Sequence, residues 1–180
     1  MKKSLFATSF GLVLSVAASS AFANTGTVHF QGTITAATCP IVIQPPSGLE
    51  GGIIDMGEVP ASAFEKVSDE KNPRDFDLVV KDGVICGITP GQVAKVTFDG
   101  PSAANNYYAI NRSPDAALGV AVALRDRNFD LVPPGSSSAE YPLNEQGESR
   151  LRFTASYVSI TDQVRAGEAL ADLSFTVDIP

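Results

Sequence analysis

The sequence contains no tryptophan, one histidine and two cysteines, and these scarcities exclude several kinds of chemistry. His29 lies on the polar side of an alternating segment, and a catalytic role would need a serine and a carboxylate from elsewhere in the chain. No Cys-x-x-Cys pair occurs, so neither a metal site nor a redox motif is indicated. We therefore expect no enzyme activity, no catalytic residue, no metal and no cofactor. An exported hydrolase is the least supported alternative, because no nucleophile and base form a recognisable pair.

The chain also has too few basic residues for a polyanion-binding protein. Its formal net charge is −7, and Lys2 and Lys3 lie in the first 23 residues, so residues 24–180 carry about −9. Nucleic acids and anionic membranes both require clustered lysine and arginine. We therefore expect no nucleic-acid partner and no membrane insertion.

Long apolar runs are missing as well, and the one at the N-terminus is short. Residues 5–18 are largely apolar, follow two lysines and precede Ala21-Phe22-Ala23, which has the small-x-small form of a cleavage site. A membrane span requires about 20 apolar residues, so a retained anchor is the weaker alternative. We predict a signal peptide over residues 1–23, which leaves 157 residues, a size typical of one domain.

Export determines how the two cysteines are interpreted. Cys39 and Cys86 are 47 positions apart in the sequence. In an oxidising compartment, a lone pair of cysteines most simply forms one disulfide. The sequence therefore predicts a structural Cys39–Cys86 disulfide.

No stretch shows a sustained helical period, whereas alternation of period two recurs along the chain. Apolar and polar residues alternate, as is typical of half-buried strands, over residues 75–80, 94–99, 120–124, 150–157 and 174–179. Proline and glycine turn signals separate these runs, for example at residues 90–91 and 133–135. The pattern predicts an all-β, immunoglobulin-like antiparallel sandwich, with a surface loop over 133–139. Residues 58–73 fit no strand pattern and could hold a short helical turn.

A further alternating segment covers residues 24–38, directly before Cys39. The residues on one side of this segment are Gly26, Val28, Phe30, Gly32 and Ile34. Such a strand must join a sheet, and two alternatives stay open at this point. It can pair within its own domain as a first strand, or it can be donated to the sheet of another molecule.

Three smaller patterns have ordinary interpretations. Residues 126–130 resemble the opening of a calcium loop, but Leu131 replaces the required glycine, so we interpret them as a turn. Asp75 and Asp77 share a strand face, which we expect to be an exposed polar face. Tyr107 and Tyr108, beside two asparagines, could form the contact patch of a secreted carbohydrate-binding module, although the absence of tryptophan argues against it.

Four blocks together are similar to the subunits of bacterial fimbriae assembled by the chaperone-usher pathway, of the type 1 pilin kind. The first is Gly26-Thr27-Val28-His29-Phe30-Gln31-Gly32 followed by Cys39, and the second is Ile54-Asp55-Met56-Gly57-Glu58-Val59 before Cys86. The third is Val96-Thr97-Phe98-Asp99-Gly100, and the last is Phe153-Thr154-Ala155-Ser156-Tyr157 followed by Gly167, Ala169, Ala171, Phe175 and Val177. One departure is Ile179, which stands where the family usually has an aromatic residue.

The resemblance implies a sandwich that lacks its final strand. Residues 39–180 would form the pilin domain, with a groove beside a C-terminal strand that contains Phe175, Val177 and Ile179. A periplasmic chaperone would bind this strand and the carboxylate of Pro180. At the outer-membrane usher, residues 24–38 of a neighbouring subunit would then replace the chaperone. The implied product is a cell-surface fimbria that supports adhesion.

Overall fold

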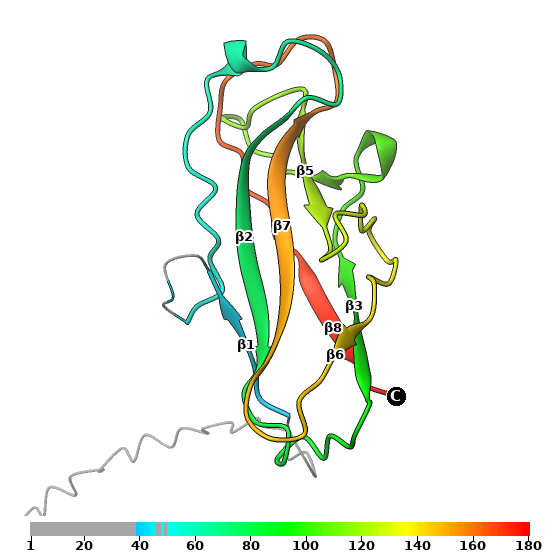
Figure 1. Ribbon diagram of the computed structural model, residues 1–180. Coiled ribbons are helices and arrows are strands. Elements are labelled where there is room, and N and C mark those ends of the chain that lie inside the picture. The colour runs from blue at the N-terminus through cyan, green and yellow to red at the C-terminus, as the bar shows by residue number, and fades with distance from the viewer. Residues whose placement is uncertain (1–38, 46–47, 49) are drawn as a thin grey trace, which may run out of the picture. The chain divides into compact units, whose positions relative to one another are not determined.

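The computed structural model describes residues 39–45, 48 and 50–180, all of which belong to one compact unit (Figure 1). The predicted signal peptide and donor segment lie outside the described residues. So do the five donor residues, which are Gly26, Val28, Phe30, Gly32 and Ile34. Within the described part, the only helices are two short 3-10 turns, η1 (Ala61–Ala63) and η2 (Ala104–Asn106).

The larger of two antiparallel sheets contains five strands in the order β1-β2-β7-β5-β4. Its strands are β1 (Ile41–Gln44), β2 (Glu70–Val80), β7 (Ser149–Ser159), β5 (Val120–Arg125) and β4 (Tyr108–Ala109). The long strands β2 and β7 pair along most of their length at its centre (Figure 1).

The smaller sheet has the order β6-β3-β8. It consists of β6 (Tyr141–Pro142), β3 (Val93–Asp99) and β8 (Ser174–Asp178). The register places Val96 opposite Val177 and Phe98 opposite Phe175. The two sheets confirm the predicted all-β sandwich architecture.

The alternating sequence explains which side chains form the core. In β3, Ala94, Val96 and Phe98 are buried, whereas Lys95 and Asp99 are exposed. Three aromatic rings fill the centre, with ring centroids 4.9 Å apart for Phe98 and Phe153 and 5.8 Å apart for Phe76 and Phe153. Edge and offset arrangements of this kind are favourable beyond the apolar area that they bury.

The predicted disulfide is present between Cys39 and Cys86, whose Cα atoms are 4.6 Å apart. It ties the short segment before β1 to the loop that follows β2. The backbone N–H of Lys81 donates to the carbonyl of Pro40 at 3.1 Å, which joins the same two segments.

Two expectations about exposed residues were wrong. Asp77 is only 6% exposed, because the guanidinium groups of Arg150 and Arg152 cover its carboxylate at 3.3 and 3.0 Å. Tyr107 and Tyr108 are also buried, so they cannot form a carbohydrate contact patch. The Tyr108 hydroxyl donates to the carbonyl of Val132 at 3.0 Å, which satisfies its polar end inside the core.

Candidate functional site

A groove opens between the edges of the two sheets, and β8 forms one of its walls. The alternation of half-buried and exposed residues in β8 extends upstream as far as Ala169. The half-buried row contains Ala169, Ala171, Leu173, Phe175, Val177 and Ile179. A central strand with this pattern would be fully buried on its inner face, so this wall is incompletely covered.

The opposite wall is the extended segment 53–59, which follows β1. Ile54 and Met56 are half-buried against the core, whereas Asp55 between them is exposed. Within residues 50–180, no hydrogen bond joins this segment to β8, whose only strand partner there is β3. The two walls therefore face each other across a gap in the sandwich.

Core side chains form the floor of the groove, which has a volume of about 700 Å³. Phe98 and Phe175 connect floor and wall, with their ring centroids 6.2 Å apart. The floor residues are Phe76, Leu78, Phe98, Val122, Leu124, Ala155 and Tyr157. The groove thus combines an apolar interior with an edge of β8 that is unpaired within the part of the chain that the structure describes, which is the arrangement that accepts an extended peptide.

A β-bulge in β2 positions the wall that contains Met56. The pairing of β2 with β7 shifts register between Lys71 and Arg74, and Asn72 there has a left-handed φ of 55°. The Asn72 side-chain amide donates to the carbonyl of Met56. Gly57 follows with a φ of 64°, and a Cβ there would lie 3.0 Å from Asn72 Nδ2. The bulge and this glycine together bring the wall close to β2.

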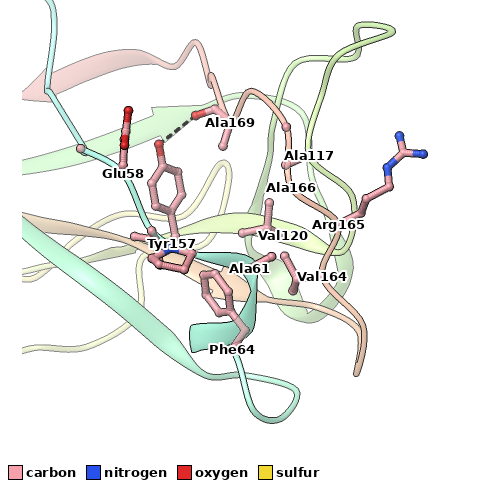
Figure 2. Close-up of a pocket in the computed structure, with 14 residues that line it drawn as sticks. Glu58, Ala61, Phe64, Ala117, Val120, Tyr157, Val164, Arg165, Ala166 and Ala169 are labelled. Atoms are coloured by element: carbon pink, nitrogen blue, oxygen red, sulfur yellow. Dashed lines mark hydrogen bonds between the residues drawn. The ribbon is translucent and has the colours of Figure 1, made fainter.

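A second pocket, of about 590 Å³, continues the groove beyond Ala169. Figure 2 shows the Tyr157 side chain in this pocket, with its hydroxyl donating to the Ala169 carbonyl at 3.0 Å. Gly57, Tyr157 and Ala169 line both hollows, while Phe64 lines only the second. Burial, with a smaller effect from the charge of Asp55, raises the pKa of the Tyr157 hydroxyl, so it stays a neutral donor.

The C-terminal end of the β8 wall is held by a side chain from the loop before β3. Gln92 Nε2 donates to the carbonyl oxygen of Pro180 at 2.7 Å, and Gln92 Oε1 accepts from the Thr89 backbone N–H at 2.7 Å. Ile179 is half-buried and Pro180 is exposed. The end of the β8 region at Pro180 is therefore accessible, and it lies beyond the residues that line the groove.

Only part of this arrangement follows from the sequence prediction. Phe175 lines the groove, whereas Val177 and Ile179 are half-buried against the core farther along the same side of the β8 region and are not part of the groove lining. The sequence prediction did not identify Ile54 and Met56 as the opposite wall. The two apolar residues are two positions apart, which is the spacing of side chains on one face of an extended segment. The sequence prediction also missed the Asn72 contact, because a bulge and its partner leave no local pattern.

The segment that resembles a calcium loop is a turn, as predicted. Asp126 Oδ1 accepts hydrogen bonds from the backbone N–H groups of Asn128 and Asp130 at 2.9 and 3.2 Å. Its other oxygen accepts from the Ala139 N–H at 2.8 Å. Over the described ranges, no cluster of three or more His, Cys, Asp or Glu side chains could hold a metal ion. The same residues contain no helix that is long and apolar enough to cross a membrane.

Comparisons with known proteins agree with this geometry. The family model described as "Fimbrial protein" matches residues 28–180. The chain is 28% identical to long polar fimbria protein A of Salmonella typhimurium strain LT2, over 98% of this chain and 96% of that protein. It is 29% identical to probable major fimbrial subunit LpfA of Escherichia coli O157:H7, with the same two coverages. A solved chaperone-usher pilus has the same fold at a TM-score of 0.60 and 24% identity, over 87% of this chain and 96% of that one.

Proposed function

Because the chain belongs to the fimbrial protein family, we propose that it is a structural subunit that polymerises by donor-strand exchange. In this proposal, residues 24–38 of one subunit fill the open groove of the next. The observation that carries the proposal is the groove itself, where Ala169, Ala171, Leu173 and Phe175 are half-buried beside an edge of β8 that has no strand partner within the described residues. The role is structural and involves no catalysis.

The donor segment has the composition that the groove requires. Val28, Phe30 and Ile34 would each contribute about 1.5–3 kcal/mol if fully buried. Gly26 and Gly32 lie on the same side and would allow close backbone approach where the groove is shallow. Backbone hydrogen bonds to the free edge of β8 would set the register.

The proposal divides the chain into three parts. Residues 1–23 are a signal peptide that is removed on export, residues 24–38 are the donor strand, and residues 39–180 form the acceptor domain. Until a donor strand arrives, the exposed apolar groove is an aggregation hazard. A periplasmic chaperone would therefore cover β8 and bind the Pro180 carboxylate until an outer-membrane usher receives the subunit for surface assembly.

Fusion of the donor segment to its own domain tests the proposal. Residues 24–36 are appended after Pro180 through a flexible linker, and thermal unfolding of the fusion is compared with that of the mature protein. We expect the midpoint to rise by roughly 10 °C or more, because three apolar side chains become buried.

The matched control is the same fusion with Phe30→Asp in the appended copy only. This control should lose most of the rise, because a carboxylate cannot be buried without a partner. Equal midpoints for the mature protein and the wild-type fusion would contradict self-acceptance.

A further inference from the structure

The loop that follows β2 presents two adjacent apolar residues to solvent. Val84 is 68% exposed and Ile85 is 62% exposed. The loop is firmly held, since Asp82 Oδ1 accepts from the N–H groups of Val84 and Ile85 at 2.8 and 3.2 Å. Gly83 donates to the Gly147 carbonyl at 3.0 Å. The exposure of this apolar pair, Val84 and Ile85, is therefore a feature of an ordered turn.

The apolar pair lies next to the point where the N-terminal segment joins the domain. Ile85 directly precedes Cys86, which is bonded to Cys39 with a Cα separation of 4.6 Å. Figure 1 shows the loop after β2 at the same end of the described domain as the start of β1. Any molecule that holds residues 24–34 must therefore lie close to this pair.

Covalent geometry limits the distance to that molecule. Five residue steps separate Ile34 from Cys39, and an extended chain covers at most about 3.3–3.6 Å per step. If Ile34 lies in a neighbour's groove, that groove begins within roughly 17 Å of Cys39. This distance leaves room for direct contact between the two domains.

The antiparallel topology indicates which end of the neighbour is contacted. All paired strands in both sheets are antiparallel, so a strand that completes the sheet beside β8 is expected to run opposite to β8. Its C-terminal end then lies toward residues 167–173, upstream of β8. Leu118, which is 51% exposed, lies at this end, because its N–H donates to the carbonyl of Arg165 at 3.0 Å. The segment before β5 is far from the loop after β2 in Figure 1.

We propose that Val84 and Ile85 form an end-to-end contact with a second copy of this chain, packing on the surface around its Leu118. The proposal rests on the proposed function, since the donated strand brings the two ends together. The partner is a copy because each chain has both the apolar pair at one end and an exposed leucine at the other. The contact would bury apolar surface that a free domain leaves in water.

The test compares polymers of the mature protein with polymers of the double variant V84S/I85S. We expect the variant polymers to dissociate in urea roughly tenfold faster than wild type, because partial burial of two apolar side chains is lost. Leu118→Ser should accelerate dissociation similarly, because it removes the other half of the same contact. The control is Phe129→Ser, which alters an equally exposed side chain, 69% accessible, in the turn after β5 and should leave dissociation unchanged.

A second measurement distinguishes the loss of this contact between copies from a loss of domain stability and from a failure of donor-strand exchange. The V84S/I85S change is placed in the fusion with residues 24–36 after Pro180, where the midpoint should stay within about 2 °C of the unaltered fusion. A large fall there would overturn the proposal, since the pair would then support the fold. Unchanged polymer dissociation would also overturn it. If the unaltered fusion gains no stability, the proposed function fails instead.

Discussion

Asn72 shows how one residue can shape a binding surface without contributing apolar area to it. Asparagine tolerates the left-handed backbone better than most residues do, and its short side chain reaches the Met56 carbonyl. Gly57 allows the approach, because a larger residue would meet Asn72 Nδ2 and the Arg74 guanidinium at 3.0 and 3.1 Å. Asp55 Oδ1 accepts from the Gly57 N–H at 2.8 Å and completes the local turn. The groove wall is therefore ordered by polar contacts behind it.

The substitution Asn72→Gly tests this role without adding backbone strain, because glycine tolerates positive φ. We expect a peptide of residues 24–36 to bind the variant domain roughly fivefold more weakly, since one hydrogen bond contributes about 1 kcal/mol. Binding is measured by calorimetry against the wild-type domain. Asn106→Gly is the matched control, because Asn106 also has positive φ, 63°, and lies outside the groove lining. Equal affinities for both variants would argue against a positioning role for Asn72.

At the level of elements, β8 differs from every other long strand in its burial. The alternation of β3 places residues such as Val96 and Phe98 fully inside, whereas the inner residues of β8 are only half-buried. The two strands have similar sequence patterns and pair directly, so the difference arises from position in the sheet. β3 has a neighbour on each side, whereas β8 is an edge strand within the described residues.

Phe175→Ala tests whether β8 waits for a partner strand. We expect the free energy of unfolding to fall by about 1–2 kcal/mol in the isolated domain and by about 3–4 kcal/mol in the fusion with residues 24–36. The larger loss in the fusion follows from the fuller burial of Phe175 under the appended strand. Urea unfolding of both forms gives the two values, with Phe129→Ala as an exposed control. A loss of the same size in both forms would mean that nothing covers Phe175.

At the scale of the whole molecule, a domain with an open groove buries less apolar surface than a complete sandwich of the same length. Its native state therefore depends more on other stabilising features, since net stabilities are small differences between large terms. The Cys39–Cys86 disulfide is one such feature, and it closes a loop with a sequence separation of 47. Under the chain-entropy description, it destabilises the unfolded state by about 4 kcal/mol.

Removal of the disulfide should accordingly have a large effect. The double variant C39S/C86S is expected to lose about 4 kcal/mol of unfolding free energy, measured in urea. Its stability should be close to that of the wild-type protein whose disulfide has been reduced. In the fusion with residues 24–36, the same variant should stay folded under conditions that unfold the isolated domain. A loss below about 1 kcal/mol would show that the unfolded chain gains little freedom when the bond is absent.

Local pattern was sufficient for much of the fold. The alternating runs predicted the strands β2, β3, β5, β7 and β8, because the two-residue period of an extended backbone is visible in a short window. The strands β1, β4 and β6 have two to four residues each and show no detectable period. β2 begins at Glu70, before the predicted run, because the bulge at Asn72 interrupts the alternation.

By itself, the sequence determined the strand alternation, the single disulfide and the apolar row of Phe175, Val177 and Ile179. Only the tertiary structure decided that residues 169–175 face Ile54 and Met56 across a groove, that Asp77 is covered by two arginines, and that Tyr107 and Tyr108 are buried. The physical reason is the range of the interactions. Alternation reflects the backbone geometry of neighbouring residues, whereas the burial of a given side chain depends on residues that are distant in the chain and meet only in the folded domain.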